Sequence, residues 1–467
     1  MQADTTADQL ISTLWHLAGQ APDALGQLSF SNLARQLPSQ FQVGALASAT
    51  IGAQALAAAE FWRLRGGRRQ SVALDQRHAL AIFRSERYLL IDGKPPADPW
   101  SPIAGYYQAG DGRWIQLHTN FPHHRDGVLR VLQCAGNRAA VAAAIAGWQA
   151  SELDARLAQE GMVAALVRSP DEWLAHPQAA AIASLPLFEI ERVADSVPEL
   201  PQPGQRPLSG VRVLDLSRVI AAPVAGRTLA QHGAEVLAIG AAHLPNIPTL
   251  VIDNGRGKRA AQLDLRSEAG RRRLRELIRG ADVFLHAYRP GALAALGFSS
   301  EELQALRPGL VEVRLSAYGH AGPWAERRGF DSLVQSATGI AWEAGRAAGS
   351  DQPGKLPCQA LDHATGYLAA FCAIAALQRR ATEGGGWRAR VSLAQTGRWL
   401  QSMPRLADGL QQADLGAAEV DQWRQTMASS YGEISAVAPA EHMSETPPHF
   451  DLPPSALDAY EASWQQD

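Results

Sequence analysis

The stretch Gly210-Val-Arg-Val-Leu-Asp-Leu-Ser-Arg-Val-Ile-Ala-Ala-Pro223 decides the expected fold. Its apolar run at 211–216 predicts a buried strand, and 223–231 predicts a helix with a proline in the first turn. Working outward, further strands are expected at 235–239, 282–286 and 310–315, and helices at 271–278, 331–339 and 362–380. Strands that alternate with helices predict an α/β fold with a parallel, doubly wound sheet.

The residues before this stretch have a different pattern. Two strands are expected at 105–108 and 113–118, joined by an Asp111-Gly112 turn, and helices follow at about 124–134, 137–147, 151–160 and 170–176. This order predicts a small α+β domain. The proline-rich run Leu200-Pro-Gln-Pro-Gly-Gln-Arg-Pro207 predicts a linker between the two parts.

The composition limits the class of protein. The chain has 467 residues, of which 46% are hydrophobic and 19% charged, as in globular proteins of about two or three domains. A net charge of −3 gives no general attraction to nucleic acid or to an anionic membrane. The three cysteines form no CxxC pair, and the polar residues 1–9 lack the basic start of a signal peptide. We therefore expect a cytoplasmic protein.

The uncharged run 43–59 is rich in alanine, whereas a membrane span would be richer in Leu, Ile and Phe, so we expect a buried helix.

This run also resembles a later part of the same chain. Ala45-Leu-Ala-Ser-Ala-Thr-Ile51 aligns with Ala360-Leu-Asp-His-Ala-Thr-Gly366 at four of seven positions. Two alanine-rich helices can match by chance, but both runs lead to basic residues, a Gly-rich turn and a strand, which favours a duplication. Ala47 then stands opposite Asp362, so only the second copy carries a carboxylate.

Few positions carry recognisable chemistry. We find no HExxH, P-loop or nucleophile-elbow motif. Asp362 is either an N-cap that accepts from free helix N–H groups or a carboxylate nucleophile. The residues His118, His123 and His124 lie close together, but their spacing matches no common ligand set, so we expect no metal site.

Basic residues offer a second kind of site. The segment Gly255-Arg-Gly-Lys-Arg259 is either a solvated turn or a phosphate grip, because Arg and Lys form charge-assisted hydrogen bonds to phosphate. Arg289 follows the strand at 282–286, and ligands of open α/β sheets bind at the carboxyl ends of strands. The predicted phosphate-binding residues are Arg256, Lys258, Arg259 and Arg289.

Together these motifs resemble the class III CoA-transferase family, which also contains α-methylacyl-CoA racemases. The resemblance rests on an ordered set of short motifs that covers about 210–395: Gly210–Pro223, Leu229–Val236, Asn254–Arg259, Tyr288-Arg-Pro-Gly291, Ser316–Pro323, Arg328-Gly-Phe-Asp331 and Asp362 with Thr365-Gly366. Residues 43–76 and 100–185 resemble the later part of a second family unit. The chain thus resembles the back half of one unit fused ahead of the front half of another.

The resemblance implies a fold, a mechanism and an assembly. It implies a Rossmann-like large domain with a smaller α+β domain, and it implies that Asp362 attacks an acyl-CoA thioester and passes CoA to a carboxylic acid. CoA thioester is the substrate, and no metal or redox cofactor is needed. The Gly319 to Gly322 loop is a candidate for the oxyanion donors. The expected assembly is a homodimer, or a pseudo-dimer built from one chain.

The expected organisation follows from the resemblance. Residues 1–95 would be a degenerate copy of the catalytic-helix segment, 96–200 the small domain, 201–209 the linker, 210–403 the large domain and 404–467 an extended tail. Two alternatives to CoA transfer stay open: a racemase-like isomerase, and a CoA-thioester-binding protein without turnover. The resemblance implies that racemases of this family carry a His in a Gly-x-Asp motif. In this chain the motif is Gly329-Phe-Asp331, so Phe330 takes the place of that His. His320 and His363 are near in sequence and could substitute for it.

Overall fold

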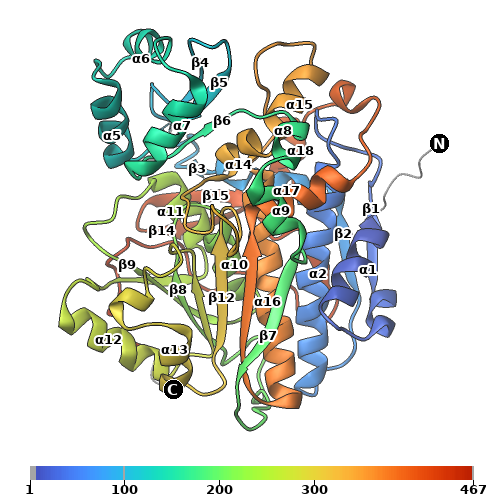
Figure 1. The fold of residues 1–467 in the computed structure, drawn as a ribbon. Helices are drawn as coiled ribbons and strands as arrows, with labels where there is room; N and C mark the ends of the chain where they lie inside the picture. Colours follow the sequence, from blue (N-terminus) through green and yellow to red (C-terminus); the bar gives the residue numbers. More distant parts are fainter. Residues whose placement is uncertain (1–6, 98–99, 465–467) are drawn as a thin grey trace.

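A computed structural model describes residues 7–97 and 100–464, and its centre is a seven-stranded sheet in the order β10-β9-β8-β11-β12-β13-β7 (Figure 1). All neighbouring strands are parallel except β7, which pairs antiparallel with β13. The mixed α/β class with a mostly parallel sheet is therefore confirmed. The strands are β7 (Phe188–Ala194), β8 (Arg212–Leu216), β9 (Glu235–Gly240), β10 (Lys258–Gln262), β11 (Val283–His286), β12 (Val311–Ser316) and β13 (Gly386–Ser392).

The direction of winding changes between β8 and β11. From β8 the chain moves outward through β9 to β10, and it then returns to the other side of β8 as β11. In open α/β sheets the ligand crevice lies at such a switch point, outside the carboxyl ends of the strands. The ends of β8, β11 and β12 are therefore the place to look for a site.

Helices cover both faces of the sheet (Figure 1). On one face, α10 (Ala221–Gln231) and α16 (Ala360–Glu383) share a core with Val213 and Val283. On the other, α12 (Glu268–Arg279) and α13 (Ser300–Leu306) share a core with Leu214 and Phe284. Successive side chains of a strand point to opposite faces, so each strand contributes to both cores.

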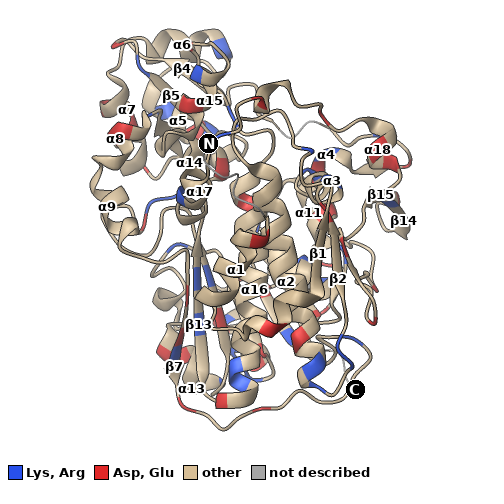
Figure 2. Cartoon of the chain, turned by 90° about the vertical axis from the view of Figure 1, so that its right-hand side faces the viewer, with Lys and Arg blue, Asp and Glu red and all other residues tan. Residues whose placement is uncertain are grey.

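The helix α2 (Val43–Leu64) packs along α16, and Figure 2 shows both helices with few charged residues. Residues 43–59 of α2 are all buried, so the prediction of a buried helix there is confirmed. Among the described helices, α16 alone is long and apolar enough to cross a membrane, and its apolar window is entirely buried inside the protein.

The elements around α2 repeat those around α16. β1 (Leu28–Ser31), α2, β2 (Val72–Asp75) and α3 (Gln76–Ile82) follow the order of β12, α16, β13 and α17 (Leu393–Ser402), and both strand pairs are parallel. Gln42 and Gln359 precede the long helices with ψ of 59° and 62°. Asp75 and Ser392 cap the helices that follow, at the same spacing. Ala45, and not Ala47, therefore stands opposite Asp362; the alignment from sequence was two residues out, because an alanine-rich helix matches in several registers.

A smaller sheet forms the upper part of the molecule in Figure 1. The predicted strands and helices of this region are present within a few residues of their expected ends, and β6 was not predicted. The elements are β4 (Gly105–Gln108), β5 (Trp114–Leu117), β6 (Ala164–Leu166), α5 (Pro122–Leu132), α6 (Arg138–Ile145), α7 (Ala150–Gln159), α8 (Pro170–Leu174) and α9 (Pro177–Ala183). The chain then enters the large sheet as β7.

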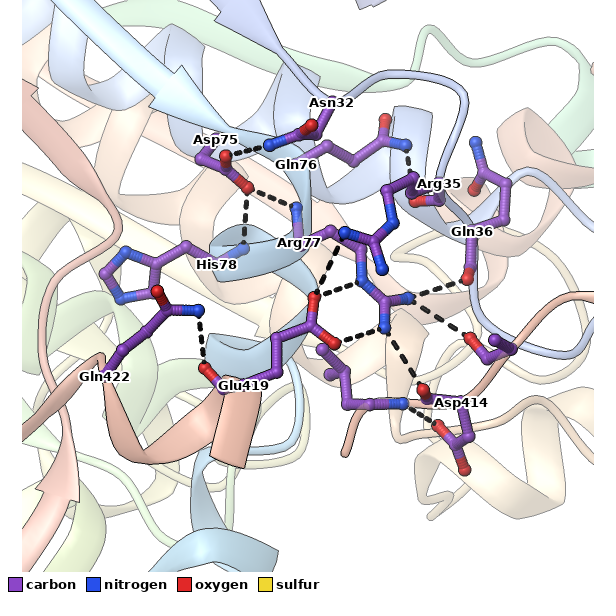
Figure 3. A network of polar contacts seen from close by, with 12 residues as sticks. Asn32, Arg35, Gln36, Asp75, Gln76, Arg77, His78, Asp414, Glu419 and Gln422 are labelled. Carbon is purple, nitrogen blue, oxygen red and sulfur yellow. Dashed lines mark hydrogen bonds and ion pairs between the residues drawn. The ribbon is translucent and has the colours of Figure 1, made fainter. Parts of the chain in front are cut away.

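The expectation of an extended tail over 404–467 is wrong for residues up to 443, which contain α18 (Ala417–Asp421), β14 (Arg424–Ser429), β15 (Gly432–Val437) and β16 (Glu441–Met443). The described residues 444–464 form no helix or strand and lie against the large domain, where Trp464 donates to the carbonyl of Leu277 at 3.0 Å. β16 pairs with β2, and β15 pairs with β3 (Leu90–Ile91). Figure 3 shows the reason at residue level: Arg77 on α3 is buried and donates to both carboxylate oxygens of Glu419 at 2.8 Å. A buried guanidinium needs such a partner, so it ties the last segment to the first.

The remaining elements connect these parts. They are α1 (Ala7–Leu17), α4 (Ser85–Tyr88), α11 (Pro248–Gly255), α14 (Asp331–Ala337), α15 (Ile340–Ala347) and the short 3-10 turns Pro22–Gln27, Ala294–Leu296 and Gly409–Gln411. Part of the polar N-terminal run, residues 1–6, lies outside the described residues.

Candidate active site

A cavity of about 420 Å³ opens at the switch point of the sheet. It is lined by the loops after β8 and β11, the end of β12, the loop before α14 and the first turn of α16. Phe121 and the first turn of α5 line it as well, so both halves of the chain contribute. The lining includes Phe121, His123, His124, Arg218, Val219, Tyr288, Arg289, Ser316, Arg328, Phe330 and Asp362.

Asp362 is the third residue of α16 and does not cap it. The carboxylate of Asp331, at the start of α14, accepts hydrogen bonds from the backbone N–H groups of Leu361 at 2.8 Å and Asp362 at 3.0 Å. The helix end is therefore satisfied by another helix, and the N-cap interpretation of Asp362 is wrong. Asp362 lines the cavity instead.

Burial and neighbouring carboxylates weaken the acidity of Asp362. Burial raises its pKa well above the usual range, and the charges of Asp331 and Glu86 add to this effect. Burial also raises the pKa of Asp331 to about 6, although the backbone N–H groups that donate to its carboxylate act to lower this pKa. Two buried carboxyls this close resist ionising together, which is a pattern of active sites.

Glu86 enters this site from α4, in the N-terminal part of the chain. Its Oε2 lies 3.2 Å from Nε2 of His363, the residue after Asp362. The ring of His363 is buried and stacks on Phe83, with centroids 5.4 Å apart. A residue of the first copy is thus held beside the aspartate of the second, which no motif in the sequence indicated.

Three arginines give the cavity a positive wall. Arg218, Arg289 and Arg328 line it, and within the described chain no carboxylate forms an ion pair with any of them. Burial and then the charges of Arg289 and Arg218 lower the pKa of Arg328, which places the three within electrostatic reach of each other. Unpaired guanidinium groups bind phosphate and carboxylate. Sequence reasoning missed Arg218, although its place just after a strand marks it in the same way as Arg289.

The other predicted phosphate-binding residues lie elsewhere. The basic segment is not a loop, because Lys258–Gln262 form β10. Arg256 pairs with Asp253 at 2.7 Å, Lys258 with Asp215 at 2.7 Å and Arg259 with Glu235 at 3.2 Å. All three basic residues are at most 9% exposed, and none lines the Asp362 cavity. Asp215 and Glu235 are distant in sequence from Lys258 and Arg259, so those two pairings did not show, whereas Asp253 lies three residues before Arg256 and that local pairing was overlooked.

The histidines lie against the cavity from the small sheet. His118 is buried and stacks on Phe330 with centroids 3.9 Å apart. Burial lowers the pKa of His118 to about 4, and burial with the neighbouring His and Arg residues lowers that of His124 to about 3. Within the described residues, no group of three or more His, Cys, Asp or Glu is arranged to hold a metal ion.

Backbone strain marks the loop after β8. Val219 has φ of +77°, in the left-handed region that β-branched residues avoid, and its carbonyl accepts from Nδ2 of Asn254 at 3.1 Å. Such strain concentrates at functional sites. By contrast, the Gly319–Gly322 loop does not line the Asp362 cavity; Gly319 lines a neighbouring cavity of about 240 Å³, which shares Arg289 and Ser316 with it. Its predicted role as oxyanion donor is therefore not supported by its position.

Comparison with known proteins shows the family of the chain. The model of CoA-transferase family III matches residues 4–189 and 208–432. The chain belongs to this family. Acetyl-coenzyme A transferase nodX of Hypoxylon pulicicidum is 32% identical over 267 residues, which are 54% of this chain and 45% of that protein. The probable fatty acyl-CoA transferase Rv3272 of Mycobacterium tuberculosis is 35% identical over 192 residues, 38% of this chain and 48% of that protein.

A crystal structure of Rv3272 in an orthorhombic form aligns with a TM-score of 0.40 and 33% identity, over 42% of this chain and 56% of that one. The chain spans about half the length of the curated relatives it matches. The family model confirms the family resemblance seen in the sequence, and its match falls in two stretches, one in each half of the chain.

Proposed function

We propose that the protein transfers CoA from an acyl-CoA thioester to a carboxylic acid, with Asp362 as the nucleophile. One observation carries the proposal: Asp362 lines the switch-point cavity while Asp331 caps its helix. A carboxylate that is not used in capping is available for attack on a carbonyl carbon. Membership of CoA-transferase family III supports the reaction class.

The reaction proceeds in exchanges of one activated acyl group for another. Asp362 attacks the thioester carbonyl and expels the CoA thiolate, which leaves a mixed anhydride. The thiolate then attacks the aspartyl carbonyl, so the acyl group leaves as a carboxylate and an aspartyl-CoA thioester remains. The acceptor carboxylate attacks this thioester next and expels the CoA thiolate, which leaves an anhydride between Asp362 and the acceptor. The thiolate then attacks the acceptor carbonyl, so the acceptor leaves as its CoA thioester and Asp362 returns to a carboxylate. We propose that no metal or redox cofactor takes part.

The positive wall of the cavity supplies charge for CoA. We propose that Arg289, together with Arg218 and Arg328, binds the CoA phosphates, because these guanidinium groups have no ion-pair partner in the described chain. Arg256, Lys258 and Arg259 are not part of this proposal, since their charges are matched by buried carboxylates.

The donor and acceptor are found by a screen. Acyl-CoA thioesters are incubated with carboxylic acids and the products are read by mass spectrometry, with D362N as the matched control. The names of the relatives point first to acetyl-CoA and fatty acyl-CoA donors. A new acyl-CoA that forms with the wild type and not with D362N supports the proposal; no transfer with any pair favours a binding protein without turnover.

The racemase alternative is weakened by Phe330. Its ring stacks on His118 and cannot donate or accept a proton, whereas the resemblance implies an acid/base group at this position in racemases. The enzyme is incubated with a 2-methylacyl-CoA in deuterated water, without an acceptor. We expect no deuterium at the α-carbon; rapid uptake that depends on Asp362 would replace transfer by racemisation.

Assembly and organisation complete the proposal. The six parallel strands have the 3-2-1-4-5-6 order of the Rossmann fold, which supports a Rossmann-like large domain over 210–403. Residues 1–95 are proposed as the degenerate copy, 96–200 as the small domain and 201–209 as the linker. We retain the homodimer and the cytoplasmic location as proposals, and a light-scattering mass of one chain in an active sample would exclude the homodimer.

A further inference from the structure

A second cavity, of about 240 Å³, adjoins the Asp362 cavity and has no role in the proposed reaction. It lies over the carboxyl ends of β11, β12 and β13 and the start of β7. Residues 288–290, Leu315 and Ser316 line both cavities. At the end of β13, Ser392 lines the second cavity and the next residue, Leu393, lines the Asp362 cavity. The crevice along the carboxyl edge of the sheet therefore continues past Asp362.

A contact between two helices places the second cavity beside the turn that carries Asp362. Thr365 lies one turn after Asp362 on α16, and its Oγ1 is 2.7 Å from Oγ1 of Thr396 on α17. Gln395, the residue before Thr396, lines the second cavity. The first turns of α16 and the second cavity are thus one side-chain contact apart, so the body of a group attached at Asp362 can extend into this cavity.

Apolar side chains form much of the wall of the second cavity. Two of them, Leu293 and Phe298, are at most 5% exposed and belong to the core between the sheet, α12 and α13. Pockets of this kind bind the apolar part of a ligand, because its atoms displace water from apolar walls. The apolar wall residues are Leu185, Leu187, Leu293, Phe298, Leu315 and Val391.

The charges in the second cavity are almost all matched by neighbouring charges. Within the described chain the exception is Arg289, which lines both cavities and is already assigned to the CoA phosphates. A ligand body with a charge of its own would therefore lose water here without gaining a free partner. The matched pairs are Arg390 with Glu191 at 2.9 Å, Arg314 with Glu312 at 2.6 Å, His320 with Glu189 at 3.3 Å and His286 with Glu312 at 3.7 Å.

We propose that the second cavity holds the hydrocarbon body of the acyl group, so that the acids exchanged on CoA carry an apolar chain or ring and no second charge. The inference rests on the proposed function and names its substrate class. The carbonyl carbon lies in the Asp362 cavity, and the body extends past Leu315 and Ser316 into the second cavity.

Two neighbouring alanines provide a matched pair of variants. Ala294 and Ala295 are both exposed and lie in the 3-10 turn Ala294–Leu296, but Ala294 lines the second cavity and Ala295 does not. A294W therefore fills the cavity, whereas A295W adds the same side chain outside it. Both are made in the full-length D362N protein, which cannot be acylated, so that binding is measured without turnover.

Dissociation constants are measured by calorimetry for acetyl-CoA, octanoyl-CoA and succinyl-CoA. We expect D362N to bind octanoyl-CoA about 10-fold or more tighter than acetyl-CoA, because each buried methylene favours binding, and succinyl-CoA no tighter than acetyl-CoA. A294W should remove the octanoyl advantage and leave acetyl-CoA binding unchanged, and A295W should keep the advantage. Equal affinity for acetyl-CoA and octanoyl-CoA in D362N, tightest binding of succinyl-CoA, or an advantage that survives A294W overturns the inference.

A photoreactive substrate locates the acyl body directly. An acyl-CoA with a diazirine at the end of its chain is irradiated with D362N, and the labelled peptides are mapped by mass spectrometry. We expect label within residues 293–298 or 391–395, and label confined to α5 overturns the inference. If the affinities and the label are as expected but the wild type transfers no CoA, the proposed function fails while the assignment of the second cavity stands.

Discussion

At the residue scale, the site depends on carboxyl groups that share a poorly solvated region. The Asp331 carboxylate accepts hydrogen bonds from backbone N–H groups in the first turn of α16. The pKa of Asp362 is raised by burial and by the negative charges of Asp331 and Glu86. Attack on a thioester requires the ionised form of Asp362. Since its pKa is raised, acylation is expected to be slow at low pH and to increase as the pH rises through that pKa.

Glu86 gives the first prediction. The variant E86Q removes a negative charge and keeps the shape of the side chain, so the pKa of Asp362 falls and the acid limb of its acylation moves to lower pH. The measurement is kcat/KM against pH. E433Q, at an exposed position on β15, is the matched control and leaves the profile unchanged. An unshifted limb in E86Q would show that Glu86 does not act on Asp362.

Asp253 gives a second prediction, on stability. Burial raises its pKa, but Arg227 and Arg256, each 2.7 Å away, and Ser85 outweigh this effect and lower it to about 2. The ionised carboxylate thus stabilises the fold fully above its ordinary pKa of 3.8, and this contribution is lost as the pH falls towards 2.

The variant D253N leaves two buried guanidinium groups without their charge partner. We expect the free energy of unfolding at neutral pH to fall by about 3–5 kcal/mol, measured by urea denaturation. The difference from the wild type should shrink when both are measured at about pH 2–3. An equal difference at both pH values would mean that the charge of Asp253 is not what stabilises the fold.

At the scale of elements, the sequence predicts whether a segment is a helix or a strand better than it predicts what that segment contacts in the fold. The strands β8, β9, β11 and β12 of the large sheet and the helices α5–α8 of the small part were expected from apolar periodicity, because burial of one face sets that pattern, whereas β7, β10 and α9 were not expected. The basic segment Gly255–Arg259 was wrongly expected to bind phosphate, because Lys258 and Arg259 lie on the edge strand β10 and meet Asp215 and Glu235. Pairing between distant segments leaves no local signal. For the same reason the strands β14–β16 were missed, since they are short and polar.

The candidate site was predictable only in part. Asp362 was indicated because the matching position in the first alanine-rich run carries no carboxylate, and Arg289 because it follows the end of a strand. Both residues line the cavity. His124, Glu86 and Arg218 come together only through the fold. Their partners, or their lack of partners, depend on the packing of the two halves, which one sequence does not encode locally.

The positive wall gives a third prediction. R289A should raise KM for acyl-CoA, with a smaller effect for a truncated thioester that lacks the nucleotide, because the arginine acts on the phosphates. The control is R259Q, whose guanidinium pairs with Glu235 away from the cavity; it should lower stability and leave KM unchanged. An equal loss with both thioesters would show that Arg289 has another role.

At the scale of the whole molecule, two unlike halves build one site. The first half provides α2, Glu86 and the histidine wall, and the second provides the sheet, the arginines and Asp362. The halves are joined by packing of α2 on α16 and by pairing of β7 with β13 and of β16 with β2. Figure 2 shows acidic and basic positions side by side along β7 and β13, as in the pair of Glu191 and Arg388.

This packing gives a fourth prediction. A protease site inserted in the linker, between Gln202 and Pro203, allows the purified chain to be cut. We expect both fragments to co-elute in gel filtration and to retain acylation of Asp362, because the contacts between the halves do not need the linker. Separation of the fragments, or full activity of the second fragment alone, would contradict a site shared by both halves.

The central claim is that Asp362 becomes covalently acylated, and trapping tests it most directly. The protein is incubated with a reactive acyl-CoA and then with hydroxylamine, which converts an activated aspartyl group to a hydroxamate, and the peptides are mapped by mass spectrometry. The account predicts a hydroxamate at Asp362 that is absent without acyl-CoA. A protein that transfers CoA with Asp362 unmodified, or with full activity in D362A, would contradict it.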